Sequence, residues 1–236
     1  MIYMGSKARF AKHIAPIVNN ALGNSSGIIY EPFCGGCNLT THLKGKVIAN
    51  DINENLIELF KEAISGRAFP AYVSREMYNE AKKGQLDRAL TAYIGFCSSY
   101  NGRYFEGYVG NGHPIANGKF RNYQQEAIKN FLDTVERLRA MESLELTSVP
   151  YYEMEIKNNS VVYCDPPYMG SKGYRTGSFD HEKFWTWADA VARNSVVFVS
   201  EYSTLSESFV PVWEMETKTT VGRTKKKATE KLFMYI

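Results

Sequence analysis

Short apolar runs alternate with amphipathic stretches at both ends of the chain. Four runs rich in Val and Ile predict strands, namely Gly27–Tyr30, Lys46–Asn50, Val161–Cys164 and Val196–Ser200. Two stretches with apolar residues at helical spacing predict helices, namely Glu54–Ile64 and His181–Ala192. Because apolar strands separated by helices form parallel sheets covered on both faces, this pattern predicts an α/β fold.

The pattern changes between Arg67 and Met141. Three helices are predicted there, over Ser74–Lys83, Leu86–Ser98 and Gln124–Arg139, and a Gly- and Tyr-rich loop at residues 101–112 interrupts them. We therefore predict that residues 67–141 form an inserted subdomain and that residues 1–66 and 142–236 form the main domain. The tail predicts two antiparallel strands, Val210–Thr217 and Lys231–Ile236, joined by a basic loop around residues 222–227.

The composition is that of a globular protein. The 236 residues are enough for one α/β domain with an insertion, and 44% hydrophobic with 22% charged residues excludes wholesale disorder. The first stretch, residues 1–14, has no apolar run of signal-peptide length, and nowhere do the roughly 18 apolar residues that a membrane-spanning helix needs run together, so we expect a cytoplasmic protein. The four cysteines lack the spacing of a disulfide framework, which favours reduced thiols.

A Gly-rich turn, Glu31–Cys37, follows the first predicted strand. Its glycines would let the backbone approach a nucleoside closely, and we expect the turn to open a helix. A second interpretation is open, because Cys34 and Cys37 have the spacing of half a zinc site or of a redox pair. Zinc needs four ligands, and the chain offers neither a second Cys-x-x-Cys nor a close pair of histidines, so we expect no metal.

Asp51 follows the second predicted strand, at the same edge of the sheet as the Gly-rich turn. Nucleoside-binding α/β folds place an acidic residue about 20 residues beyond such a turn, where it hydrogen-bonds ribose hydroxyls. Asp51 is therefore a candidate for ribose binding. The alternative is that Asp51 is the N-cap of the helix that begins near Glu54.

The tetrad Asp165-Pro166-Pro167-Tyr168 follows the third predicted strand and carries the strongest chemical signal. Its prolines hold the backbone extended and remove two N–H donors, which leaves carbonyl groups facing a pocket. A flipped adenine can give its amino protons to the Asp165 carboxylate and the Pro166 carbonyl while Tyr168 stacks on its ring. Alignment of nitrogen, methyl carbon and sulfur then permits direct displacement without a covalent enzyme intermediate. The alternative is a strand ending in a proline-rich turn with no chemical role.

The order of these motifs resembles that of the Dam-like (D12 class, alpha group) adenine-N6 DNA methyltransferases. The resemblance runs from Tyr3-Met4-Gly5-Ser6-Lys7 through the Gly-rich turn and Asp51 to the tetrad, although the family usually has glycine where this chain has Cys37. It implies a Rossmann-like S-adenosylmethionine-dependent methyltransferase fold with a helical target-recognition insertion. The catalytic residues that it implies are Asp165, Pro166, Pro167 and Tyr168. The residues that it implies for S-adenosylmethionine are Tyr3, Lys7, Glu31, Phe33, Gly35, Asp51, Ile52 and Asp165.

Contacts with double-stranded DNA are expected in two parts of the chain. The net charge of +3 is too small to indicate a nucleic-acid partner. Sixteen Tyr residues suit stacking on splayed bases, and the alternative is that they fill the core and surface of an α/β domain. The candidates in the inserted loop are Asn101, Arg103, Tyr104, Lys119 and Arg121, and those for phosphate contacts are Lys172, Lys225, Lys226 and Lys227. Arginine can pair with guanine in the major groove, whereas lysine mainly adds salt-sensitive affinity for phosphates. For residues 225–227, a solvated hairpin tip is the alternative.

Three other functions match parts of this pattern. Cytosine-N4 methyltransferases use the same attack by an exocyclic amine, but they more often carry Ser than Asp at the first position of the tetrad. A catalytically idle DNA-binding module would not need Asp165, Tyr168, Asp51 and Lys7 together. A nicotinamide dehydrogenase usually has a Gly-x-Gly-x-x-Gly motif, which the first turn lacks. We therefore predict an enzyme, working as a monomer, that methylates adenine in DNA.

Overall fold

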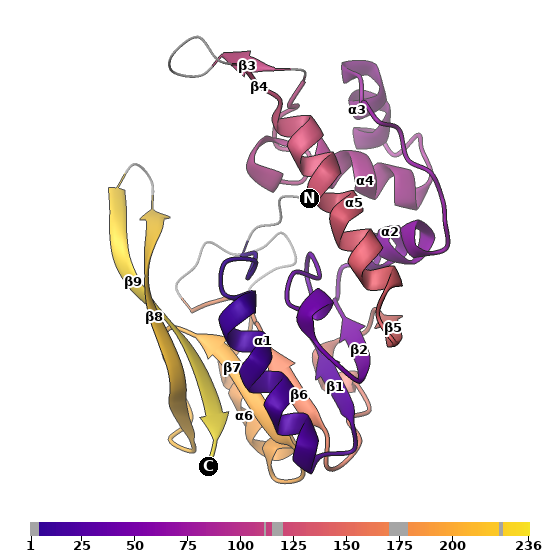
Figure 1. Cartoon of the computed structure of the whole chain (residues 1–236). Helices are drawn as coiled ribbons and strands as arrows, with labels where there is room; N and C mark the ends of the chain where they lie inside the picture. The colour runs from indigo at the N-terminus through magenta and orange to yellow at the C-terminus, as the bar shows by residue number, and fades with distance from the viewer. Residues whose placement is uncertain (1–4, 111, 115–119, 170–178, 222–223) are drawn as a thin grey trace.

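A seven-stranded sheet in the order β5-β2-β1-β6-β7-β9-β8 forms the centre of the protein (Figure 1). The computed structural model describes residues 5–110, 112–114, 120–169, 179–221 and 224–236. The strands of this sheet are β1 (Ile28–Glu31), β2 (Lys46–Asn50), β5 (Ser143–Thr147), β6 (Val161–Cys164), β7 (Val196–Glu201), β8 (Phe209–Val221) and β9 (Thr224–Tyr235). The first five strands of the order pair in parallel, whereas β9 runs antiparallel to both of its neighbours, β7 and β8.

Helices cover both faces of the sheet because its central strands are apolar on both sides. In β6 all four residues are buried, and they alternate between two hydrophobic clusters. Val161 packs in the cluster that includes residues of α1 (Ala11–Asn20), and Val162 packs in the cluster that includes residues of α6 (His181–Ala192). Figure 1 shows these two helices on opposite faces. This arrangement confirms the predicted Rossmann-like α/β fold.

The inserted helices gather beyond one end of the sheet (Figure 1). They are α3 (Arg75–Lys82), α4 (Arg88–Cys97) and α5 (Tyr123–Arg139), and they pack with α2 (Glu54–Ile64). Each helix begins at an N-cap whose side chain accepts a backbone N–H, and these N-caps are Asn53, Ser74, Asp87 and Asn122. A small hairpin, β3 (His113–Pro114) and β4 (Phe120–Arg121), precedes α5.

The remaining regular elements are four short 3₁₀ helices, among the residues that the structure describes. They are η1 (Ala21–Asn24), η2 (Thr40–His42), η3 (Tyr100–Gly102) and η5 (Tyr151–Glu153). The Gly-rich turn after β1, which the sequence predicts to open a helix, leads into the three-residue 3₁₀ helix η2 and not into an α-helix. Cys37, at φ 55°, takes the left-handed conformation inside the turn, which breaks the run of right-handed residues that an α-helix needs.

The C-terminal hairpin is longer than the sequence pattern predicts. Strands β8 and β9 pair continuously up to Val221 and Thr224, so Lys225–Lys227 belong to a strand and not to a loop. Threonine has a high strand propensity, and Thr219 and Thr220 pair with Lys226 and Lys225 in this ladder, whereas Lys227 pairs with Lys218. The hairpin extends beyond the sheet toward the same end of the molecule as the inserted helices (Figure 1).

Two further expectations concern membrane-spanning helices and the state of the cysteines. Within the described ranges, no helix combines the length and apolar character needed to cross a membrane. All four cysteines, Cys34, Cys37, Cys97 and Cys164, are free and buried, as the sequence predicts.

Candidate active site

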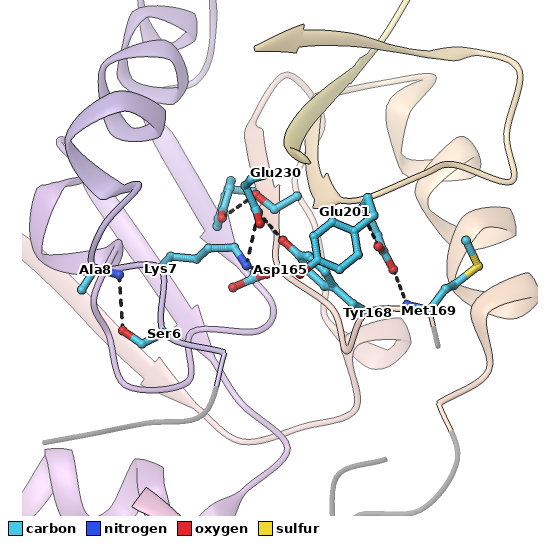
Figure 2. Close-up of polar contacts among 11 residues, drawn as sticks. Ser6, Lys7, Ala8, Asp165, Tyr168, Met169, Glu201 and Glu230 are labelled. Atoms are coloured by element: carbon cyan, nitrogen blue, oxygen red, sulfur yellow. Dashed lines mark hydrogen bonds and ion pairs between the residues drawn. The ribbon is translucent and has the colours of Figure 1, made fainter. Parts of the chain in front are cut away.

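Four side chains meet at the carboxyl end of β6, and Figure 2 shows them in close contact. The ammonium Nζ of Lys7 lies 2.8 Å from Asp165 Oδ1 and 3.4 Å from Glu230 Oε1. The hydroxyl of Tyr168 donates a hydrogen bond to the same Glu230 oxygen. Lys7 Nζ also lies 4.2 Å from the centre of the Tyr168 ring, within the range of a cation–π contact.

Three distant segments of the chain supply these side chains. Lys7 lies just before α1, and its carbonyl accepts the N–H groups of Phe10 and Ala11, both at 2.8 Å. Asp165 directly follows the buried strand β6, and Glu230 lies on β9. Because β6 and β9 both flank β7 in the sheet, the fold brings both carboxylates within reach of one ammonium group.

Burial and charge act against each other on this cluster. Burial raises the pKa of Asp165 to about 6, although the Lys7 ammonium opposes the rise; Glu230 adds to it. For Lys7, burial by itself lowers the pKa, but the charges of Asp165 and Glu230 outweigh it, so the pKa of Lys7 is raised. Lys7 is therefore a cation at neutral pH, and Asp165 is mostly ionised above about pH 6.

The backbone after the tetrad is fixed by a second buried carboxylate, that of Glu201 at the end of β7. Its Oε1 accepts the N–H of Met169 at 2.7 Å, and its Oε2 accepts the N–H of Tyr202 at 2.6 Å (Figure 2). The ring of Tyr202 packs edge-on against the Tyr168 ring, with 4.7 Å between centroids. Glu201 thus fixes the chain on one side of Tyr168 while Glu230 binds its hydroxyl.

Asp51 joins the turns that follow β1 and β2. Its two carboxylate oxygens accept the N–H groups of Gly35 and Asn53, each at 2.9 Å. The N-cap of α2 is Asn53, whose side chain accepts the N–H of Leu56, so the alternative that Asp51 is the N-cap is wrong. Burial raises the pKa of Asp51, and the two hydrogen bonds limit the rise.

A buried hydrogen bond joins Glu31 and Thr40, the residues at the two ends of the segment that contains the Gly-rich turn. The Thr40 hydroxyl donates to Glu31 Oε2 at 2.6 Å. Burial raises the pKa of Glu31 to about 8, which the hydrogen bond only partly offsets. In the turn itself Gly35 has φ 47° and Cys37 has φ 55°, so Cys37 adopts the left-handed conformation that glycine adopts at lower cost.

Two apolar side chains beside these turns differ in exposure. Phe33 packs in an aromatic cluster, with its ring centroid 5.3 Å from that of Tyr151 and 5.7 Å from that of Phe184. Ile52, next to Asp51, leaves 53% of its surface exposed. An exposed isoleucine beside buried polar groups offers an apolar surface that a ligand could cover.

The sequence of the chain matches the family of D12 class N6 adenine-specific DNA methyltransferases over residues 3–197. The chain belongs to this family. Membership confirms the family predicted from the sequence, and it agrees with S-adenosylmethionine as the methyl donor.

One curated relative and two solved structures are similar to the chain. The retron Ec67 DNA adenine methylase of Escherichia coli is 28% identical over 180 residues, which span 65% of this chain and 60% of that protein. A putative RNA methyltransferase, PH1948, from Pyrococcus horikoshii is 10% identical with a TM-score of 0.46, over 99% of this chain and 85% of that chain. Magnesium protoporphyrin IX methyltransferase from Synechocystis, solved with bound SAM, is 10% identical with a TM-score of 0.40, over 96% and 78% of the two chains.

The residues predicted to contact DNA differ in their exposure and in their side-chain partners. Asn101 and Arg103 are exposed, and Arg103 lies 3.9 Å from Glu106. Tyr104 is half-buried, and its ring packs against Phe96 with 4.7 Å between centroids. Arg121 is half exposed and forms a bidentate pair with Glu126, with contacts of 2.8 Å from both Nε and Nη2.

The other basic candidates lie on or near the C-terminal hairpin and in segments that are not described. Lys227 is exposed on β9. Tyr3, Lys119 and Lys172 lie outside the described residues, and so do the side chains of Lys225 and Lys226. Among the residues that the structure describes, no group of three His, Cys, Asp or Glu side chains could hold a metal ion.

The sequence patterns miss Glu230, Glu201 and two exposed rings, those of Tyr100 and Phe120. Glu230 and Leu232 are both buried on one face of β9, so a glutamate in an inward-facing strand position is the signal that could have identified Glu230. Tyr100 and Phe120 leave 57% and 76% of their surfaces exposed in the insertion.

Proposed function

We propose that the chain transfers a methyl group from S-adenosylmethionine to N6 of an adenine that is flipped out of double-stranded DNA. The observation that carries this proposal is the Asp165 carboxylate, which directly follows β6 and is largely buried in contact with Lys7. A carboxylate in this place accepts a proton from an exocyclic amine, and the adjacent Tyr168 offers a flat ring for the base.

The side chains at this edge suit S-adenosylmethionine, which supplies an activated methyl group on a positively charged sulfur when bound. Asp51 keeps unused lone pairs on both oxygens after accepting the N–H groups of Gly35 and Asn53, so it can accept ribose hydroxyls as well. The exposed Ile52 offers an apolar surface for the adenine ring of the cofactor. Two carboxylates, those of Asp165 and Glu230, contact the single ammonium group of Lys7. The cluster therefore has an excess of acidic groups, which favours a cationic ligand. Tyr3, Glu31 and Phe33 complete the proposed cofactor site.

In the proposed reaction, residues of the chain align the target amine with the methyl group and supply a negative charge beside it. Asp165 accepts one N–H of the adenine amine, which orients the nitrogen lone pair toward the methyl carbon. A nitrogen–carbon bond forms while the carbon–sulfur bond breaks, and the electron pair of the broken bond stays on sulfur. The nitrogen becomes positively charged, and its extra proton passes to the Asp165 carboxylate and then to solvent. The raised pKa of Asp165, about 6, suits this proton transfer near neutral pH.

We propose that residues 67–141 are the target-recognition part. The exposed Asn101 and Arg103 suit contacts with base edges, and Tyr100 offers a ring for stacking. Arg121 would have to exchange Glu126 for a DNA acceptor. The C-terminal hairpin, through Lys227 and its neighbours Lys225 and Lys226, would contribute phosphate contacts.

Replacement of Asp165 tests this proposal against an idle DNA-binding module. We expect Asp165→Asn to bind DNA with nearly unchanged affinity and to lose about 10²-fold or more in kcat, because the amide keeps the shape but not the charge. Asp165→Ala should lose methylation entirely within detection. The matched control is Asp189→Asn on α6. Equal methylation by wild type and both Asp165 variants would refute the assignment.

A further inference from the structure

Glu230 is a buried carboxylate that none of the sequence motifs explains. It lies on β9, near the end of the chain, and only 3% of its surface is exposed. Its Oε1 lies 3.4 Å from the Lys7 ammonium and accepts the hydrogen bond of the Tyr168 hydroxyl (Figure 2). A single buried oxygen therefore contacts two side chains of the proposed methyl-transfer site.

The packing of β9 does not require a carboxylate at this position. Leu232, two residues further on the same face, is fully buried, so an apolar residue at 230 would suit the same layer of side chains. Burying a carboxylate costs free energy that only well-placed partners offset. The two partners, Lys7 and Tyr168, therefore account for the glutamate better than the sheet does.

We propose that Glu230 is a positioning residue for methyl transfer, which holds the Lys7 ammonium and the Tyr168 hydroxyl so that Asp165 and the tyrosine ring meet the target amine in a fixed geometry. This inference rests on the proposed function. Lys7 carries three N–H donors, so it can serve Asp165 at 2.8 Å and Glu230 at 3.4 Å together. Sharing the ammonium between two carboxylates leaves Asp165 more capacity to accept the substrate amine.

The charge of Glu230 also suits the reaction. The attacking nitrogen becomes positive during transfer, and a second buried carboxylate that shares Lys7 with Asp165 favours that charge. Glu230 acts here through Lys7 and Tyr168 and not by contact with the substrate. The removal of its charge should therefore change how Asp165 titrates, which the loss of a packing contact alone would not do.

The test compares Glu230→Gln, Glu230→Leu and a control, Glu216→Gln, which changes an exposed glutamate on β8 of the same hairpin. For each full-length variant we would measure kcat, KM for DNA and the pH profile of methyl transfer. Glu230→Gln should shift the acidic limb of the profile downward by roughly 0.5–1 pH unit, because a negative neighbour of Asp165 is removed. Glu230→Leu should lower kcat by roughly 10- to 100-fold with little change in KM, because Lys7 and Tyr168 lose a shared anchor. Glu216→Gln should match the wild type.

A second measurement does not need activity. Titration of the Asp165 carboxyl group by NMR should give a lower pKa in Glu230→Gln than in the wild type, and the Glu216→Gln control should not change it. An active wild type with unchanged kcat, pH profile and Asp165 titration in Glu230→Gln would overturn the positioning role. A wild type that transfers no methyl group would refute the proposed function instead, and the NMR titration would still decide the role of Glu230.

Discussion

In the proposed reaction Asp165 must remain an acceptor, although only 16% of its side chain is exposed. Burial raises the pKa of its carboxyl group to about 6, and the Lys7 ammonium at 2.8 Å prevents a larger rise. Protonation would place a donor where the substrate amine also donates. The balance between burial and Lys7 therefore sets the lowest pH at which the site can work.

Lys7→Met should raise the pH at which methyl transfer begins. In the wild type we expect kcat/KM to increase with pH through about 6, the pKa of Asp165 in the free enzyme. Without the ammonium group the pKa of Asp165 rises, so the acidic limb should move to higher pH. Steady-state kinetics between pH 5 and pH 9 would measure this, with Lys12→Met, an exposed position on α1, as control. A downward shift in Lys7→Met would contradict the account.

Glu31→Gln should change the pH dependence of stability. Burial raises the pKa of folded Glu31 from 4.5 to about 8, so the contribution of this group is fully present below pH 4.5 and is lost as the pH rises through 8. The free energy of unfolding should fall by about 1.4 kcal/mol per pH unit in that window from this group alone. Denaturant unfolding from pH 5 to pH 8 should show this difference between wild type and Glu31→Gln, with a control variant at the exposed Glu54, Glu54→Gln, showing the wild-type pH dependence. Parallel pH curves would show that Glu31 is ionised in the fold.

The turn after β1 carries a residue other than glycine, Cys37, in the left-handed conformation. Its φ of 55° is strained for any residue with a Cβ atom, and its side chain is fully buried. Cys37→Gly and Cys37→Ala both remove the buried thiol, but only glycine relieves the backbone strain. Cys37→Gly should therefore be the more stable of the two, by up to about 1 kcal/mol after the greater freedom of unfolded glycine is counted. Thermal unfolding of the two variants measures this, and a more stable Cys37→Ala would argue against strain in the turn.

Features that depend on neighbouring residues could be predicted from the sequence. The apolar runs of β1, β2, β6 and β7 ended in polar turns, and parallel pairing placed those turns at one edge, where Gly35 and Asp51 are in contact. Features that depend on distant pairing could not. Glu230 enters the site because β9 inserts between β7 and β8, and no local pattern specifies this order.

The contacts that side chains make with distant residues could not be predicted from the local sequence either. Residue type favours Arg121 for DNA contact, but Glu126, one turn into α5, accepts hydrogen bonds from two nitrogen atoms of the Arg121 guanidinium. Tyr104 lies in the loop that the sequence favours for DNA, yet its ring fills the space over Gly95, where an added Cβ would lie 2.3 Å from it. Residue type alone therefore does not rank the candidates for DNA contact. The packing of the insertion is also needed.

The two proposed DNA-contacting parts extend toward the same end of the molecule, the insertion on one side and the C-terminal hairpin on the other (Figure 1). A duplex held between them would touch base edges through the insertion and phosphates through the hairpin. Residues of the two parts should therefore affect binding in different ways.

Arg103→Ala and Lys227→Ala should separate these effects. If Arg103 reads a base, its loss should reduce discrimination at one base pair by roughly 1–3 kcal/mol. Loss of Lys227 should weaken binding to all DNA sequences similarly. It should also reduce by about 1 the magnitude of the slope of the logarithm of the binding constant against the logarithm of the salt concentration. Binding to a panel of duplexes at several salt concentrations measures both. The same uniform loss in both variants would remove Arg103 from base recognition.

The central claim is the transfer of a methyl group to adenine N6 in DNA. The most direct test incubates the purified full-length chain with unmethylated double-stranded DNA and S-adenosylmethionine carrying a labelled methyl group, and then digests the DNA to nucleosides. The account predicts that the label is recovered in N6-methyldeoxyadenosine and is absent with Asp165→Ala. Label in N4-methyldeoxycytidine, or unlabelled DNA with an enzyme that still binds the cofactor, would contradict it.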